Sequence, residues 1–253
     1  MLINILIILA CTGAALLFLF AVTRIWPHPA RKESNDFTGA VVQVIGTTYA
    51  VILAFTLSGV WNNFQEAQAN EEQEANALTN IYRVATTLQD PNAQRIQELC
   101  ARYADNALQH EWPEMSRDQT PAEADEISDQ LWALAGQAQA HAAPDAIAAY
   151  QLMEELRLLT QYRRLRIMQA RERLPVLLWL VLIAGGVITV AAACFFGVSN
   201  FRFHLLQVLV LTLMISLVLF AIADIDRPYQ GLVIVAPNGF ESVAQKLQIN
   251  RTR

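Results

Sequence analysis

The side chains of this chain that could do chemistry fall into two groups. The first is a series of small and polar residues at alternating three- and four-residue steps, a spacing that places them on one face of a helix. We call this series the polar stripe. The second group is a pair of aspartates after the last apolar segment, with an arginine-rich segment that could meet them. The polar stripe consists of Gln43, Thr47, Ala50, Ala54, Ser58, Trp61, Gln65, Gln68 and Glu72.

The polar stripe predicts a helix that lines an aqueous path, because a polar face sustained through an apolar segment is unfavourable in hydrocarbon. In a ring of subunits, Trp61 would form the tightest and driest point, and hydrophobic constrictions can gate by expelling water. A ring of Glu72 carboxylates at the mouth would attract cations and repel anions. The stripe therefore favours a pore with a lean towards cations.

Two other interpretations of the polar stripe stay open. Small residues at four-residue spacing let membrane helices pack closely, and tryptophans such as Trp61 often anchor helices at the membrane interface. The third apolar segment has the close-packing pattern at Gly185, Thr189, Ala193 and Gly197.

The second group lies at the end of the last apolar segment, where Asp224 and Asp226 begin the sequence DIDRPYQG. Two carboxylates at a bilayer boundary need solvent or cationic partners. We expect them to meet the arginine-rich segment 163–173. The alternatives are a helix stop with local ion pairs and a small cation site, since hard cations bind carboxylate and carbonyl oxygens. The arginines expected at this boundary are Arg163, Arg164 and Arg171.

Enzymatic function is not supported by any motif. The four histidines are scattered, without an HExxH sequence or a nucleophile elbow, so we predict neither an enzyme nor a cofactor. We expect Glu71, Glu72 and Glu74 to form a solvated charged helix face. The net charge of −5 gives no basic surface for nucleic acid. The three cysteines suit a reducing compartment and cannot form a disulfide framework.

Four apolar segments determine the fold class. Each is long enough to cross a bilayer, which takes ~20 residues at ~1.5 Å per residue. The chain is 54% hydrophobic, and its mean hydropathy of +0.29 is diluted by the polar residues between the segments. The sequence thus predicts an all-α membrane protein with a water-exposed domain at 62–173 and a tail at 224–253. The predicted spans are 2–23, 38–61, 174–198 and 203–223.

The first apolar segment invites another interpretation, as a cleaved signal. Its first residues carry no side-chain charge, and its apolar run is longer than the ~7–15 residues of a signal peptide. The sequence before Cys11 loosely resembles a lipoprotein cleavage site, but too little apolar sequence precedes it. We expect a retained span.

The polar segment 62–173 is rich in Ala, Gln, Glu, Leu and Arg, which are strong helix formers. Prolines divide it into helices expected near 62–89, 92–111, 122–140 and 145–173. The first has an apolar stripe at Leu78, Ile81, Ala85 and Leu88. No helix breaker lies between 38 and 88, so span two should continue as one helix, and we expect span three to continue likewise from the helix before it.

Orientation follows from basic residues near the span ends. Both termini and the 62–173 domain lie on one side, which carries the dense arginine run at 163–173. The opposite side carries Arg24, Arg31, Lys32 and Arg202. The arginine run favours a cytoplasmic domain and cytoplasmic termini.

The sequence resembles a known family at three places in order along the chain. These are Tyr49…Phe55…Trp61, the run EAxxxEEQEANALTNIYR that starts at Glu66, and DIDRPYQG. Together they resemble the bacterial bestrophin-like domain family of unknown function, and more distantly the bestrophins, which are pentameric channels that conduct mainly anions. The resemblance implies a homo-oligomer in the bacterial inner membrane, a pentamer by analogy, with two span pairs around a cytosolic helical insert.

Two departures limit what the resemblance implies. In bestrophins, acidic calcium ligands follow a Pro-aromatic-x-Gly turn, whereas here the aspartates precede Pro228 and Gln230-Gly231 follow it. A calcium site is therefore not carried over, and no metal is assigned. Only Trp61 and Phe64 match an aromatic-lined neck, so anion selectivity is not carried over either.

Two functions from different classes remain. The first is an oligomeric ion channel in which span two lines the pore. The second is a membrane-anchored scaffold or sensor whose helical domain binds a partner, without transport. A ring of subunits with an axial path favours the channel, and a monomer or two-fold dimer without one favours the scaffold.

Overall fold

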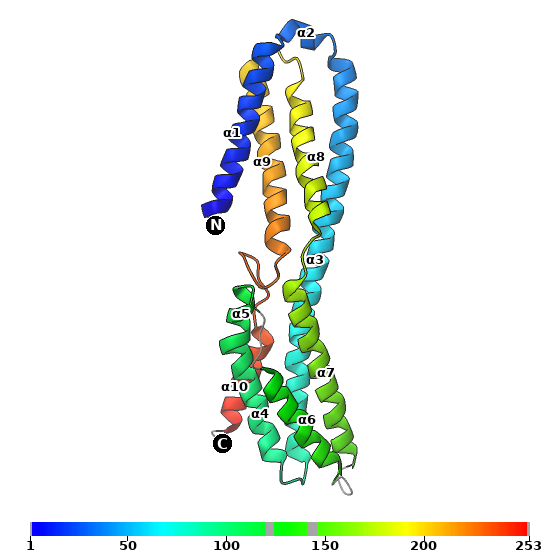
Figure 1. Cartoon of the computed structure of the whole chain (residues 1–253), viewed down its shortest axis with the longest axis vertical. Coiled ribbons are helices and arrows are strands. Elements are labelled where there is room, and N and C mark those ends of the chain that lie inside the picture. Colours follow the sequence, from blue (N-terminus) through cyan, green and yellow to red (C-terminus); the bar gives the residue numbers. More distant parts are fainter. Residues whose placement is uncertain (1, 120–123, 141–145, 252–253) are drawn as a thin grey trace. The chain divides into compact units, whose positions relative to one another are not determined.

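A computed structural model describes residues 2–119, 124–140 and 146–251, and every regular element within those ranges is a helix (Figure 1). This confirms the all-α prediction. The beginnings of two predicted helices, at 122–123 and 145, lie outside the described residues. The chain divides into two compact units. We call Met1–Trp61 with Arg173–Asp226 the transmembrane unit, and Asn62–Glu172 with Arg227–Arg253 the helical unit.

Among the described residues, four helices are long and apolar enough to cross a membrane. The transmembrane unit contains three of them and the first part of the fourth. Helix α1 packs along α9, and α8 contacts both. One apolar core joins α1, α8 and α9 through Leu19, Cys194 and Val208, and a second joins α3, α8 and α9 through Leu53, Leu182 and Ile222. The elements are α1 (Leu2–Ile25), the short α2 (His28–Lys32), the first part of α3 (Asn35–Thr87), α8 (Val176–Cys194) and α9 (Phe201–Ile225).

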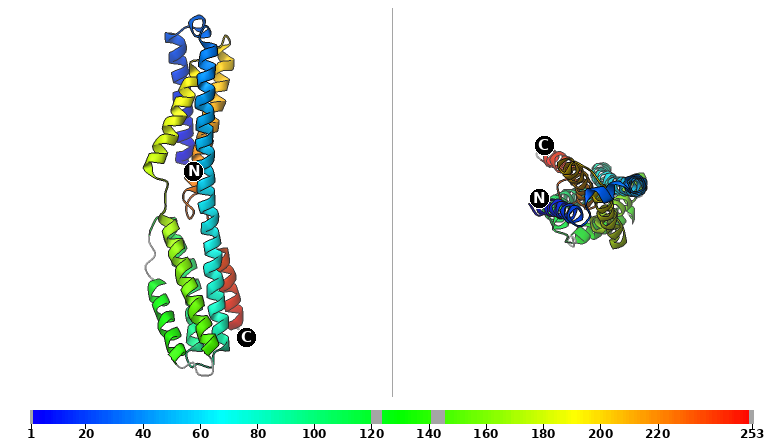
Figure 2. Two further views of the ribbon diagram at one scale, coloured as in Figure 1. Left: turned by 90° about the vertical axis from the view of Figure 1, so that its right-hand side faces the viewer. Right: turned by 90° about the horizontal axis from the view of Figure 1, so that it is seen from above.

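Helix α3 is the longest element and runs as one ribbon from Asn35 to Thr87 (Figure 2). This confirms the single helix predicted from 38 to 88. Its sequence has no proline, and its helix-forming residues continue past the apolar part, so nothing in the backbone ends it earlier.

The matching prediction for span three is wrong. Helix α7 (Ala146–Arg171) ends before α8 begins, and Pro175 between them has an extended backbone with φ −56° and ψ 143°. A proline disfavours the helical conformation of the residue before it, which here is Leu174. The free N–H of Leu174 donates instead to the Asp226 carboxylate, with an N···Oδ1 distance of 3.0 Å.

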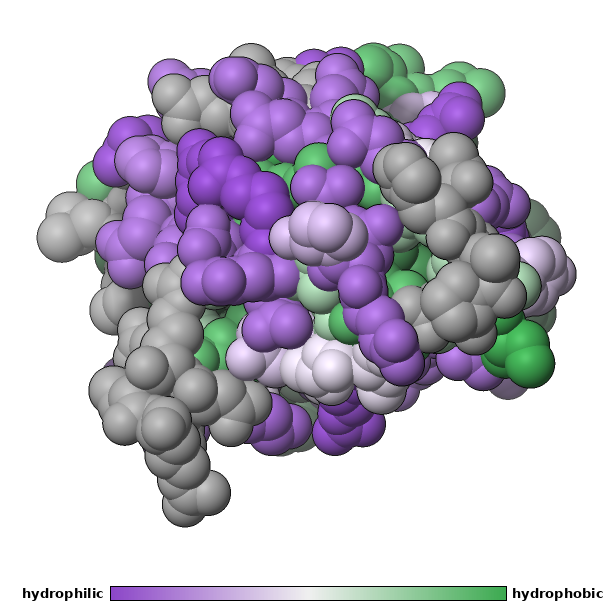
Figure 3. Space-filling model, turned by 90° about the horizontal axis from the view of Figure 1, so that it is seen from below, coloured by the Kyte–Doolittle hydropathy of each residue, from purple (hydrophilic) through white to green (hydrophobic). Residues whose placement is uncertain are grey.

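The helical unit buries the apolar stripe predicted in its first helix. Helix α6 contacts α4 and α7, while α10 contacts α4 and η1. Leu78, Ile81, Ala85 and Leu88 are all buried, as the spacing predicts. Figure 3 shows one face of the molecule covered mainly by hydrophilic side chains. Besides α7 and the second part of α3, the elements are α4 (Ala93–Asn106), η1 (Ala107–Glu111), α5 (Trp112–Ser116), α6 (Ala124–Ala140) and α10 (Asn238–Arg251).

The helix predicted at 92–111 does not end at Trp112-Pro113 but continues to Ser116 through the π-helical turn η1. Proline inside an α-helix lacks the N–H for an i→i−4 bond and clashes with the facing carbonyl. In η1 the Trp112 N–H bonds to the Ala107 carbonyl, five residues back, which widens the turn and resets the register. The same turn places Glu111 in the interior, where it is 1% exposed.

Candidate functional site

The polar stripe lies along α3 on an exposed face of the subunit. All nine of its side chains are exposed, including Gln43, Ser58 and Trp61 in the transmembrane unit and Gln65 and Glu72 in the helical unit. A different face of α3 supplies the buried residues. The stripe is thus available to water, to lipid or to another subunit.

Close packing of α3 in the transmembrane unit uses Tyr49, which is not in the stripe. A Cβ added to Gly185 would lie 2.5 Å from the Tyr49 ring, so α8 needs glycine to receive this tyrosine. The Tyr49 hydroxyl donates to the Leu182 carbonyl at 2.9 Å. The small residues of span three therefore serve helix packing, as their spacing predicts, whereas those of the polar stripe do not pack within the subunit.

The expected solvated face at Glu71, Glu72 and Glu74 is wrong for two of its three members. Glu72 is exposed, but Glu71 is 1% exposed and Glu74 is fully buried. Burial of a carboxylate requires a partner, and the helical unit supplies one for each.

Glu74 belongs to a buried ion cluster centred on Arg166 of α7. Arg166 Nε lies 2.7 Å from Glu74 Oε2, and its Nη2 lies 2.9 Å from Glu74 Oε1. Nη2 also donates to Glu111 Oε2. The Tyr103 hydroxyl donates to Glu74 Oε1 at 2.8 Å. Arg163 adds a second cation, with its Nη2 3.0 Å from Glu111 Oε1.

The two signs of charge hold each other ionised in this cluster. Burial alone would lower the pKa of Arg166, but Glu74 and Glu111 raise it well above its usual value. Burial alone would raise the pKa of Glu111, but Arg166 and Arg163 hold it below its usual value. Burial also raises the pKa of Tyr103, which therefore remains a hydroxyl that donates to Glu74.

Aromatic rings from α5 and from the C-terminal segment lie over Arg166 of the buried ion cluster. Arg166 Cζ lies 4.6 Å from the Trp112 ring centroid and 5.8 Å from that of Phe240, both within range of a cation–π interaction. Tyr229, from the DIDRPYQG motif, packs edge-on against Trp112 at 5.9 Å. Gln230 of the same motif donates from Nε2 to the Met115 carbonyl at 3.1 Å. Tyr229 and Gln230 thus pack within the helical unit.

Glu71 of α3 forms a hydrogen bond with the first turn of α10. Its Oε1 accepts the Phe240 backbone N–H at 3.2 Å, one of the N–H groups that a helix start leaves unpaired. Burial raises the pKa of Glu71 to about 7, although the backbone N–H groups of Phe240 and Gly239 oppose the shift and Glu74 and Glu72 add to it. Glu71 therefore titrates near neutral pH.

The residues predicted for the boundary site lie in different surroundings. Asp226 accepts the Leu174 N–H at the start of α8, and Asp224 lies in the last turn of α9. Arg163 belongs to the buried ion cluster, while Arg164 and Arg171 are exposed. Pairing of the aspartates with the arginine-rich segment stays a prediction. Within the described ranges, no group of three or more His, Cys, Asp or Glu side chains could hold a metal ion.

A sequence signal for the buried carboxylates does exist. Stepping back from Leu78 by four and then three residues reaches Glu74 and Glu71, so both continue the apolar stripe. Their partners Arg166 and Phe240 lie far away in the sequence, and no local pattern links them.

Comparison with known proteins places this fold. A model of the Bestrophin-like domain family matches residues 9–240. A crystal structure of a bacterial bestrophin homologue from Klebsiella pneumoniae is similar at a TM-score of 0.73 and 12% identity, covering 97% of this chain and 99% of that chain. A point mutant of that homologue is similar at a TM-score of 0.71 and 13% identity, covering 94% of this chain and 98% of that chain. No curated protein matches. The chain belongs to the Bestrophin-like family and has the fold of bacterial bestrophin homologues.

Proposed function

We propose that this protein is a subunit of a homo-oligomeric, bestrophin-like ion channel in which the polar stripe of α3 lines the ion path. The observation that carries the proposal is the exposure of the whole stripe, while α3 packs through a different face. Gln43, Thr47 and Ser58 lie within an apolar helix, and polar groups at membrane depth are favourable only where they meet water or protein. A shared path among subunits provides both.

The charge on the stripe supports a lean towards cations. Glu72 is exposed and makes no ion pair with any described residue, so each subunit would add an unbalanced carboxylate to the path. A ring of like charges raises the local concentration of counter-ions and excludes ions of its own sign. Trp61, 44% exposed, is the largest side chain of the stripe and is therefore the candidate for the narrowest point of the ion path.

We place the channel in a bacterial inner membrane with the termini and the 62–173 domain in the cytoplasm. A cysteine replacing the exposed Gln137 should then resist an impermeant thiol reagent added to intact cells, while one replacing the exposed Ser34 should react. The reverse labelling pattern would reverse the orientation.

The experiment for the proposed function is a reversal-potential measurement in planar bilayers under a salt gradient. Glu72→Lys should shift the reversal potential towards the anion value, because it inverts the charge at the mouth. Glu66→Lys is the matched control, since Glu66 is also exposed on α3 but lies outside the stripe. Equal shifts in both variants would mean a general surface-charge effect. The absence of current from both wild type and Trp61→Ala would favour the scaffold.

A further inference from the structure

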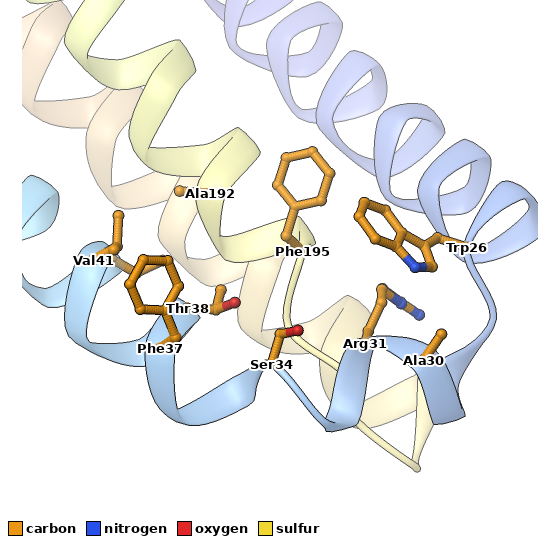
Figure 4. Close-up of a pocket in the computed structure, with 10 residues that line it drawn as sticks. Trp26, Ala30, Arg31, Ser34, Phe37, Thr38, Val41, Ala192 and Phe195 are labelled. Atoms are coloured by element: carbon orange, nitrogen blue, oxygen red, sulfur yellow. The ribbon is translucent and has the colours of Figure 1, made fainter.

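The transmembrane unit contains a pocket of about 290 Å³ beside the connection between α1 and α3 (Figure 4). Its walls are mostly apolar and include three aromatic rings. Its polar members come from α2 and the residues just after it. The lining includes Trp26, Phe37 and Phe195 on the apolar side and Arg31, Ser34 and Thr38 on the polar side.

Arg31 is a buried cation that the protein only half satisfies. Its side chain lines the pocket and is 5% exposed. Nη1 donates to the Cys194 and Phe196 carbonyls, each at 3.1 Å, at the end of α8. Nε has no hydrogen-bond partner, and Arg31 forms no ion pair with the residues that the structure describes. The carbonyls at a helix end offer only about half a negative charge against this cation.

Backbone and side-chain contacts beside the pocket join Lys32 and Asn35 to Gly197, which follows α8. Asn35 Nδ2 donates to the Gly197 carbonyl at 3.0 Å, and the Gly197 N–H donates to Asn35 Oδ1 at 2.8 Å. A Cβ on Gly197 would lie 2.5 Å from the Lys32 nitrogen, so the two backbones touch. Arg31 is therefore held in place without any ligand, and binding requires little ordering.

We propose that this pocket binds the acidic headgroup of a membrane phospholipid. Its phosphate would complete the charge balance of Arg31 and accept hydrogen bonds from Ser34 and Thr38, whose hydroxyls make none to described protein groups. In Figure 4 these three side chains project from the same side, facing the rings of Phe195 and Trp26. The source is a lipid rather than a free anion, because the remaining walls are apolar and one of them, Phe37, is itself 76% exposed.

The test is native mass spectrometry of the full chain in detergent, titrated with phosphatidylglycerol or with zwitterionic phosphatidylcholine. Phosphatidylglycerol should bind more tightly than phosphatidylcholine. Arg31→Met should weaken the binding of phosphatidylglycerol by about tenfold or more, as expected for loss of a charge-assisted contact. Arg24→Met is the matched control, since Arg24 is exposed at the end of α1 and does not line the pocket. It should leave binding unchanged.

Two further variants keep the test decisive if Arg31→Met does not assemble. Thr38→Val removes one hydroxyl, and Ala30→Trp fills the space from an exposed position, and both should weaken phosphatidylglycerol binding while Arg31 stays in place. Unchanged binding in both would overturn the proposal, as would equal binding of the two lipids. Competition by inorganic phosphate at concentrations similar to the lipid would show a free-anion site instead. None of these readouts depends on ion conduction, so they are independent of the proposed function.

Discussion

Arg31 in the transmembrane unit and Arg166 in the helical unit are both buried, but their surroundings differ. Arg166 of the helical unit has Glu74 and Glu111 as partners and aromatic rings over its face. Arg31 of the transmembrane unit has two carbonyls, an unpaired Nε and an adjoining pocket. Removing a buried cation whose charge is fully matched leaves its partners unpaired and destabilises the fold, whereas a buried cation matched in part is suited to bind something else.

The same comparison separates the two halves of α3. In the helical unit, buried acidic residues of α3 anchor α7 and α10. In the transmembrane unit, α3 packs through Tyr49 and leaves the polar stripe exposed. The polar stripe is exposed along both halves, so the halves differ in how their buried face packs, through carboxylates in the helical unit and through an apolar core with Tyr49 in the transmembrane unit.

The largest expected effect is at Arg166. Arg166→Met leaves Glu74 as an uncompensated buried carboxylate and Glu111 with Arg163 as its remaining cation. Breaking a buried pair in this way typically costs about 3–5 kcal/mol. Thermal unfolding of the full chain in detergent would measure it. The control is Glu154→Gln, which removes an exposed ion pair with Arg157 and should leave the unfolding midpoint unchanged. A midpoint for Arg166→Met equal to that of wild type would refute the structural role of the cluster.

The next effect is a pH dependence at Glu71. Its folded-state pKa, raised from 4.5 to about 7, means that Glu71 contributes stability below pH 4.5 that is lost as the pH rises through 7. The shift corresponds to at most about 3 kcal/mol. Glu71→Gln should flatten the dependence of the unfolding midpoint on pH between 5 and 8. Glu66→Gln, which changes an exposed carboxylate of α3 that does not shift the pKa of Glu71, should keep this dependence. An unchanged slope in Glu71→Gln would contradict the assignment.

A smaller loss is expected at Arg31. Arg31→Met removes hydrogen bonds from a charged donor, which are worth about 1.5–3 kcal/mol, and leaves no carboxylate behind without a partner. The unfolding midpoint should therefore fall less than for Arg166→Met. If the two variants lose equal stability, Arg31 is as fully compensated as Arg166, and the contrast between the two units fails.

Sequence reasoning identified the helices well because their determinants are local. The apolar segments and the absence of helix breakers predict the four spans and α3, and the spacing of Leu78 and Ile81 predicts the buried stripe. Pro175 is also a local signal, because a proline disfavours the helical conformation of the residue before it, Leu174.

The parts that sequence reasoning missed depend on residues distant in the chain. Glu74 is buried because Arg166 faces it from 92 positions away, and Glu71 because α10 begins beside it. Arg31 contributes to the orientation prediction as a basic residue near a span end, and the structure buries it against the end of α8, 163 positions away. Local patterns show the charge of such residues but not the partner that removes them from water.

The smallest effect is expected at Asp226. Asp226→Ala removes the acceptor of the Leu174 N–H, and a hydrogen bond of this kind contributes about 0.5–1.5 kcal/mol. The unfolding midpoint should fall slightly, and Asp226→Asn, which keeps a side-chain carbonyl, should recover much of the loss. A loss as large as that of Arg166→Met would show that Asp226 pairs with buried arginines, as the sequence-based prediction of a boundary ion pair requires.

The central claim is that the polar stripe faces the ion path, and cysteine modification during bilayer recording tests it most directly. Thr47 and Thr48 are both exposed, but only Thr47 lies on the stripe. In a background where the exposed Cys11 is replaced by Ser, a cationic methanethiosulfonate reagent should reduce the current through Thr47→Cys and leave Thr48→Cys unaffected. Trp61→Ala can be added to both if the wild-type current is small. Equal effects on the two variants, or modification of Thr48→Cys alone, would contradict a pore lined by this face of α3.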